Sequence, residues 1–207
     1  MLHLRDTKDD NMGLNVIPPL VLAKFEPYEF RHAAAIMSQD FPNEWGDILA
    51  LLSSLEIPVG WITSPGGNKS KIADYVDHFL CGARGWSEKK FETKITVDGR
   101  HFSSPTHKVD CYKNGVAFEL EWNNKDPFFD RDLNNFRLLF DLRMISVGII
   151  LTRADALQDV FDKLGKGASY GNSTTHMSKL IPRIEGGGGA GCPVLVFGIR
   201  PTCVKGV

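Results

Sequence analysis

The sequence predicts a single α/β domain with a mixed central sheet, in which an antiparallel hairpin leads into parallel strands flanked by helices. The chain has 207 residues and 43% hydrophobic content, which suits one well-buried domain. Two strand-like runs, 109–112 and 116–122, are separated by a segment with an Asn-Gly pair, a strong signal for a two-residue turn. An amphipathic helix over 130–144 and a short apolar strand over 145–151 then complete a parallel crossover unit.

The first part of the chain is expected to supply helices that cover this sheet. Residues 1–25 open with a polar, charged stretch, and we expect them to be flexible or peripheral. Residues 26–41 have a weak helical pattern, and a stronger helix begins at Pro42, after which apolar residues recur at helical spacing. Another helix follows the loop 64–68 and ends near Gly85.

The sheet and its later elements follow in order along the chain. Its first strand is expected at 91–97, where polar and apolar residues alternate before an Asp-Gly turn. After the crossover unit, the pattern indicates a helix at 154–164, a loop rich in Gly, Ser and Thr at 165–176, a Gly-rich connection at 186–191, and a last strand at 194–199.

Composition narrows the classes of protein that fit. The net charge of −1 argues weakly against a protein that coats nucleic acid, because such proteins carry a clear excess of Lys and Arg. The start of the chain lacks the apolar core of a signal peptide, and no apolar run reaches membrane-spanning length, so a cytoplasmic protein is expected. Four cysteines without CxxC spacing are expected to be reduced thiols rather than zinc ligands.

Three carboxylates are expected on one polar face of the hairpin. If Asn114 and Gly115 form the turn, Asp110 lies opposite Glu119, and like charges in that position are destabilising. Glu121 projects to the same face, because side chains alternate along a strand. A hard divalent cation such as Mg²⁺ is the simplest compensator, because it prefers oxygen ligands. Bound there, it would polarise a phosphate and activate a water.

The alternative is an exposed acidic strand face without a metal. In that case lysines would neutralise the carboxylates, and the same register places Lys108 opposite Glu121, with Lys113 and Lys125 nearby. Spacing alone does not choose between these two interpretations.

Several segments in this region resemble the core of BglII/BstYI-type restriction endonucleases, in their variant of the PD-(D/E)xK nuclease motif. The strongest resemblance is in the middle third of the chain, at 107–110, 119–123, 126 and 129–133, and it continues through 145–150. It extends more weakly to 192–199 and to the helix that carries Trp45. The resemblance implies a restriction-endonuclease-like core, with 1–207 as one nuclease domain and 91–153 as its catalytic core.

The same resemblance implies roles for the three acids. It assigns the metal to Asp110 and Glu119, and it makes all three acids catalytic. The motif position usually held by Lys is Glu121 here, so whether that residue orients the water, binds a second metal or acts as the base stays open. The implied enzyme is a Mg²⁺-dependent type II site-specific deoxyribonuclease that cuts double-stranded DNA as a homodimer. A cognate DNA methyltransferase is a possible functional partner.

Two further segments are candidates for DNA contacts. Asn68, Lys69 and Lys71 lie at the start of a predicted helix, where free N–H groups and positive charge suit a phosphate, although ordinary helix capping explains them equally well. The loop residues Ser173, Thr174, Thr175 and His176 carry short donors and acceptors that suit base edges in the major groove. The alternative for this segment is a plain surface loop.

Two other functions compete with restriction. One is a metal-dependent DNA repair or nicking nuclease on the same fold, because a fold does not settle a function. The other is a catalytically inactive DNA-binding module, in which the acids are merely exposed. A Ser or Cys hydrolase has little support, since the sequence contains no Gly-x-Ser-x-Gly motif.

Overall fold

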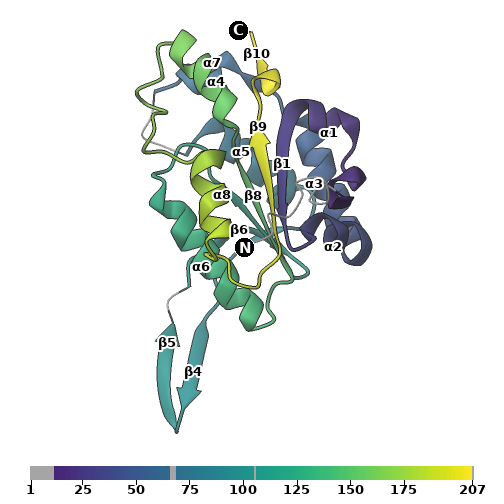
Figure 1. Cartoon of the computed structure of the whole chain (residues 1–207), viewed down its shortest axis with the longest axis vertical. Coiled ribbons are helices and arrows are strands. Elements are labelled where there is room, and N and C mark those ends of the chain that lie inside the picture. The colour runs from purple at the N-terminus through teal and green to yellow at the C-terminus, as the bar shows by residue number, and fades with distance from the viewer. Residues whose placement is uncertain (1–11, 66–68, 105, 207) are drawn as a thin grey trace, which may run out of the picture.

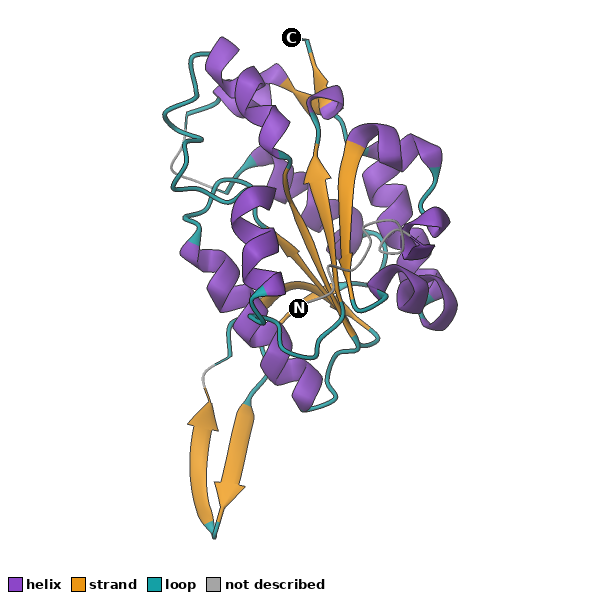
Figure 2. Ribbon diagram, in the orientation of Figure 1, coloured by secondary structure: helices purple, strands orange, loops and turns teal. Residues whose placement is uncertain are grey.

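A six-stranded mixed sheet lies between two layers of helices in the computed structural model, which describes residues 12–65, 69–104 and 106–206 (Figure 1, Figure 2). The strand order is β1-β9-β8-β7-β6-β3. The strands are β1 (Phe25–Phe30), β3 (Ser87–Lys89), β6 (Val109–Lys113), β7 (Val116–Leu120), β8 (Val147–Arg153) and β9 (Val194–Ile199). β6 and β7 pair antiparallel, and β7, β8 and β9 pair parallel, which confirms the predicted hairpin that leads into parallel strands.

Helices cover both faces of this sheet and divide its apolar residues into two cores. One face packs against helices from the first part of the chain and against α7, and the other packs against α6 and α8. The α-helices are α1 (Pro19–Lys24), α2 (Ala33–Asp40), α3 (Pro42–Ser54), α4 (Val59–Thr63), α5 (Lys71–Asp77), α6 (Pro127–Asp141), α7 (Gln158–Lys163) and α8 (Met177–Glu185). Shorter elements are η1 (Met12–Val16), the π-helical turn η2 (His78–Gly82), η3 (Asp155–Leu157), η4 (Pro201–Cys203), and the strand pair β2 (Ile57–Pro58) and β10 (Val204–Lys205).

The β6–β7 hairpin forms as its local sequence predicts. Asn114 and Gly115 both have positive φ angles, 46° and 85°, as a type I′ turn requires. The ladder pairs Lys113 with Val116 and continues to Cys111 and Phe118, which is the expected register. The turn therefore sets which side chains of the two strands face each other.

The helix α6 lies unusually close to the sheet at Gly148 on β8. A Cβ atom at this glycine would lie 2.3 Å from the ring of Phe136, so only a residue without a side chain fits beneath that ring. Phe136 and its neighbours on α6 join the second core together with Val194 and Val196 of β9. The missing Cβ thus fixes the height of α6 above the sheet.

Three expectations about secondary structure were wrong or incomplete. The weakly helical stretch 26–41 instead contains the edge strand β1, followed by α2, because pairing with β9 overrides the local pattern. Pro27 is tolerated there because β1 has a neighbour on one side only. The helix α8 was not predicted; it is short and contains Pro182, although Met177, Leu180 and Ile184 form its buried face.

The expected first strand of the sheet, 91–97, was also wrong. Its core becomes β4 (Thr93–Val97), which pairs with β5 (Arg100–Ser104) in a separate two-stranded hairpin. This hairpin extends away from the rest of the molecule (Figure 1). The Asp-Gly turn pairs β4 with β5 rather than with the main sheet. The edge of the main sheet is formed by β3.

The described part of the stretch 1–25 contributes to the first core. Of the stretch 1–25, residues 1–11 lie outside the described residues, whereas Ile17 and Val21 are buried in the first core. None of the helices in the described ranges combines the length and apolar character needed to cross a bilayer. All four cysteines are free thiols.

Candidate active site

The three predicted acids come together on the side of the sheet that α6 and α8 cover. Alternation along β7 sends Phe118 and Leu120 into the first core and leaves Glu119 and Glu121 on the opposite face, as predicted. Both glutamates are only 1% exposed, whereas Asp110 on β6 remains exposed to solvent. The cluster therefore has a buried interior and one carboxylate at its solvent edge.

The contact between Asp110 and Glu119 differs from a simple cross-strand pair. The backbone pairing of β6 and β7 ends at Cys111 and Phe118. Beyond this point carboxylate oxygens, rather than backbone carbonyls, accept hydrogen bonds from the N–H groups of the opposite strand. The N–H of Asp110 donates to Oε2 of Glu119 at 3.3 Å, and the N–H of Leu120 donates to Oδ2 of Asp110 at 3.1 Å. A register shift between β3 and β6 lies at the same place, and such bulges re-aim side chains next to active sites.

None of the lysines proposed to neutralise the acids does so. The two glutamates are buried, so the expectation of an exposed acidic strand face does not hold for them. The lysines have other partners: Lys108 pairs with Glu88 at 2.7 Å, Lys113 pairs with Asp47 at 2.8 Å, and Lys125 donates to Ser173 at 3.4 Å.

Two residues of α6 that the sequence reasoning missed complete the cluster. Asp132 is a fourth acid and is 1% exposed. Arg131 is a cation that forms ion pairs with Asp132 and Glu121. Nη2 of Arg131 lies 2.7 Å from Oδ1 of Asp132 and 3.3 Å from Oε1 of Glu121. A signal was present, since Asp132 lies three residues after Phe129 and four before Phe136, inside the apolar stripe of α6. An acid in such a stripe must have a partner or a function.

Burial raises the pKa values of all four acids, and the charges of neighbouring acids add to the shift in Asp110, Glu119 and Glu121. Burial is the largest cause for Glu119, whose pKa lies well above its ordinary value, and the charges of Asp132 and Asp110 add to it. Burial and the charge of Asp132 raise the pKa of Glu121 to about 9, although Asn124 and Arg131 oppose the shift. Burial also raises the pKa of Asp132, and desolvation by the surrounding protein raises the pKa of Asp110 although this residue reaches solvent. One arginine does not balance four acids, so the site favours additional positive charge.

The oxygen atoms in the cluster fit a hard divalent cation. Oε1 of Glu119 and Oδ2 of Asp132 are buried and have no hydrogen-bond partner among the described residues, and such atoms cost free energy unless something binds them. In the same part of the chain, no three His, Cys, Asp or Glu side chains already converge on one metal position. Carboxylate reorientation, starting with the unpaired oxygen of Glu119, would therefore accompany binding of a cation.

The first candidate DNA-contact segment is divided between different environments. Asn68 lies outside the described residues. Lys69 forms an ion pair with Asp77 and lies 3.8 Å from Asp74, whereas Lys71 is exposed. The hydroxyl of Ser70 caps α5 by accepting from the N–H of Ala73 at 3.2 Å, so helix capping is present at this point.

The second segment, 173–176, has both exposed and buried side chains. Ser173 is exposed, but Thr174 and Thr175 are buried. His176 is half-buried, and its Nδ1 lies 2.7 Å from Oδ1 of Asp155. The buried cation Arg153, which the sequence reasoning did not single out, binds this loop from inside.

Comparison with known proteins identifies the family. A search of curated proteins gave no match. A comparison with protein families matches residues 25–199 to the family described as restriction endonuclease BglII/BglIII. The matched range includes every strand of the main sheet and all four acids of the cluster. Members of this family are site-specific deoxyribonucleases, and the chain belongs to the BglII/BglIII restriction endonuclease family.

Proposed function

We propose that this protein is a type II restriction endonuclease that uses Mg²⁺ to hydrolyse phosphodiester bonds at a specific sequence in double-stranded DNA. The observation that carries the proposal is the acid cluster, in which Glu119 keeps an unpaired buried oxygen beside the solvent-facing Asp110. Family membership supplies the reaction class. The cluster supplies oxygen ligands of the kind that Mg²⁺ selects.

Each acid has a distinct position in the proposed reaction. Asp110 and Glu119 would hold the metal, which when bound polarises the scissile phosphate and lowers the pKa of an attacking water. Arg131 and Asn124 hold the carboxylate of Glu121, with Nδ2 of Asn124 at 2.8 Å from its Oε2. A carboxylate fixed from two sides suits the orientation of a water, and its raised pKa keeps it protonated near neutral pH in the absence of a metal, so that it cannot accept a proton there.

DNA contacts are assigned to the side chains that reach solvent. Lys71 suits a phosphate, and Ser173 and His176 suit base edges, because all three are at least partly exposed. Thr174 and Thr175 are buried, so their proposed contribution is to shape the loop rather than to contact bases. Asn68 and Lys69 remain candidates for phosphate contacts.

The proposal includes a symmetric assembly and a biological setting. A homodimer matches a twofold-symmetric duplex site, because each protomer then cuts one strand. A methyltransferase that modifies the same site would protect the DNA of the host cell. A location in the cytoplasm, where the DNA substrate would be present, is part of the proposal.

The experiment that tests this proposal is cleavage of a long DNA of mixed sequence. The purified protein is incubated with Mg²⁺ or with EDTA, and the ends of the fragments are sequenced. Ends that depend on Mg²⁺ and share a short twofold-symmetric sequence support the proposal. Scattered or structure-dependent cuts would indicate a repair or nicking nuclease, and an absence of cleavage with any divalent metal would indicate an inactive binding module.

A further inference from the structure

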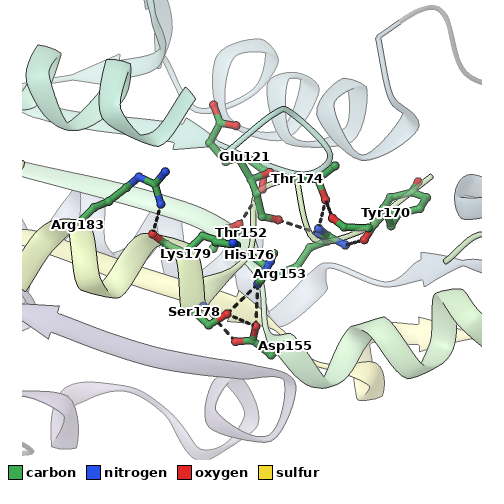
Figure 3. Close-up of polar contacts among 12 residues, drawn as sticks. Glu121, Thr152, Arg153, Asp155, Tyr170, Thr174, His176, Ser178, Lys179 and Arg183 are labelled. Carbon is green, nitrogen blue, oxygen red and sulfur yellow. Dashed lines mark hydrogen bonds and ion pairs between the residues drawn. The ribbon is translucent and has the colours of Figure 1, made fainter. Parts of the chain in front are cut away.

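The end of β8 connects the acid cluster with the loop 169–176. The hydroxyl of Thr152 donates to the backbone carbonyl of Glu121 at 2.8 Å. The side chain of the next residue, Arg153, donates to the loop, and Asp155 binds His176 at the end of the loop and Ser178 just after it (Figure 3). One short segment thus contacts both the strand that carries the acids and the loop that we assign to base contacts.

Arg153 uses its whole guanidinium group for this purpose. Its Nε donates to the carbonyl of Thr175 at 2.9 Å, its Nη1 donates to the carbonyl of Tyr170 at 3.2 Å, and its Nη2 donates to Oγ1 of Thr174 at 2.5 Å. The guanidinium carbon also lies 5.2 Å from the ring centre of Phe161 and 5.5 Å from that of Tyr170. The three donors of a rigid fork therefore fix three points of one loop.

This cation is costly, which argues for a specific role. Arg153 is 2% exposed, and within the described ranges no carboxylate forms an ion pair with it. Burial lowers its pKa to about 10. An apolar residue of similar volume would fill the same space without the cost of desolvating a charge. What an apolar residue cannot supply is the set of directed hydrogen bonds that hold the loop.

The opposite side of the loop is bonded to the segment that follows Glu121. The N–H of Thr175 donates to the carbonyl of Asn124 at 2.9 Å, and the N–H of Asp126 donates to the carbonyl of Ser173 at 3.0 Å. Asn124 in turn binds the carboxylate of Glu121 through its side chain. The loop is held between Arg153 and the segment 121–126. Two hydrogen bonds, both of which involve Asn124, connect the loop to Glu121.

We propose that Arg153 is a positioning residue for sequence recognition, which holds the loop 169–176 in register with the acid cluster. The inference rests on the proposed function, in which Ser173 and His176 contact base edges. When the guanidinium fixes the loop, a mismatched base pair displaces the scissile phosphate from the acids, and discrimination results. A loop that is free to adapt would tolerate the mismatch and still allow cleavage.

The test compares full-length variants on the mixed-sequence DNA described above. Arg153→Lys keeps the positive charge but loses the fork. Thr174→Val keeps the side-chain shape but removes the hydroxyl, which accepts from Arg153 and also donates to the carbonyl of Gly171 within the loop. Lys24→Met is the matched control, because Lys24 is another buried cation, 9% exposed, and donates to the carbonyl of Ser53 at 2.8 Å without contacting the loop. The quantity measured is the ratio of cleavage at the preferred site to cleavage at sites that differ by one base pair.

The expected result separates discrimination from folding. The ratio should fall at least about tenfold in Arg153→Lys and in Thr174→Val, which is the loss of roughly one base contact. Lys24→Met should keep the ratio of the unsubstituted protein. Mg²⁺ should raise the melting temperature of all three variants as much as that of the unsubstituted protein, because the acids are unchanged.

Several results would overturn this inference. An unchanged ratio in a folded Arg153→Lys protein would do so, and so would an equal fall in Lys24→Met, which would make the effect one of general stability. If circular dichroism shows that Arg153→Lys does not fold, the ratio for Thr174→Val decides. Should the unsubstituted protein lack Mg²⁺-dependent cuts at a fixed sequence, the proposed function fails and the inference fails with it.

Discussion

The two faces of β7 have opposite characters although they belong to the same five-residue strand. One face carries Phe118 and Leu120, and Trp122 follows on the same side just beyond the end of the strand. These side chains pack in the apolar core under helices from the first part of the chain. The other face carries Glu119 and leads to Glu121, and both lie buried beneath α6. Burial is nearly equal on the two sides, so burial alone does not distinguish a stabilising residue from a functional one.

The difference between the faces is one of free energy. Burying apolar area on the first face stabilises the fold. On the second face, four acids share one arginine, and the raised pKa values indicate that their charged forms are unfavourable there. The first face should therefore respond to substitution mainly in stability, and the second mainly in activity and metal binding.

The largest effect on activity is expected from removal of an acid that we propose to bind the metal. Asp110→Ala and Glu119→Ala should each lower the rate of cleavage at least about a thousandfold, since a metal ion contributes several kcal/mol of transition-state stabilisation. Folding should be retained, as judged by circular dichroism. Glu88→Ala is the control, because Glu88 is an exposed acid on β3 outside the cluster. A rate within tenfold of the original in either acid variant would remove that residue from the metal site.

A substitution on the apolar face should have the converse effect. Phe118→Ala should lower the free energy of unfolding by about 3–5 kcal/mol, because it leaves a cavity in a closely packed core. For a chain of this size the melting temperature should fall by roughly 6–20 °C. The comparison would break if Glu119→Ala, measured in EDTA, cost as much stability as Phe118→Ala.

The metal-free protein should lose stability as the pH rises. In EDTA the folded state holds a proton on Glu121 up to about pH 9, whereas an unfolded glutamate releases it near about pH 4.3. The folded state binds more protons between these values, so the free energy of unfolding falls with pH, by at most about 1.4 kcal/mol per pH unit for one group. Urea unfolding between pH 6 and 9 measures this slope.

The matched variant for this slope is Glu121→Gln. It should flatten the pH dependence, and at pH 8 it should raise the free energy of unfolding by about 1–3 kcal/mol, since glutamine is neutral in both states and folding no longer requires the uptake of a proton. Added Mg²⁺ should reduce the slope of the unsubstituted protein by stabilising the ionised acids. A slope that is identical in the two proteins would show that Glu121 titrates normally.

The smallest effect is expected at the edge of the acid face, in the loop 169–176. Ser173→Ala and His176→Ala should each change the preference among sites by roughly fivefold, equivalent to about 1 kcal/mol for one hydrogen bond. The melting temperature should change by less than about 2 °C for Ser173→Ala, because that side chain is exposed. Ser87→Ala, an exposed serine on β3, is the control. Unchanged preference in both loop variants would leave the loop as a connector.

The parts of the fold that the sequence predicted correctly are those determined locally. The β6–β7 turn depends on two residues whose φ angles are positive, and β8 and β9 are short apolar runs that read as buried strands. In contrast, β1 is a strand only because it pairs with β9, which lies far along the chain. The Asp-Gly turn was recognised, but the strand after it was not, although β4 and β5 pair locally across this turn.

The candidate site divides in the same way. Asp110, Glu119 and Glu121 were found because a hairpin register and the two-residue period of a strand are enough to place them on one face. Arg131 and Asp132 come from a helix that crosses over the sheet, and Arg153 is hidden at the end of an apolar strand. Sequence periodicity states which face of α6 is buried, but it does not state what lies beneath that face.

The close approach at Gly148 has a consequence for how changes spread through this enzyme. Phe136 contacts the bare backbone of β8, and Asp132 lies one turn earlier on the same helix. Any side chain at position 148 would clash with Phe136 and push α6 away from the sheet. Because Arg131 and Asp132 lie on the same helix, they would move away from β7 as well. A substitution at this glycine is therefore expected to inactivate the enzyme, although Gly148 is not one of the charged residues of the acid cluster.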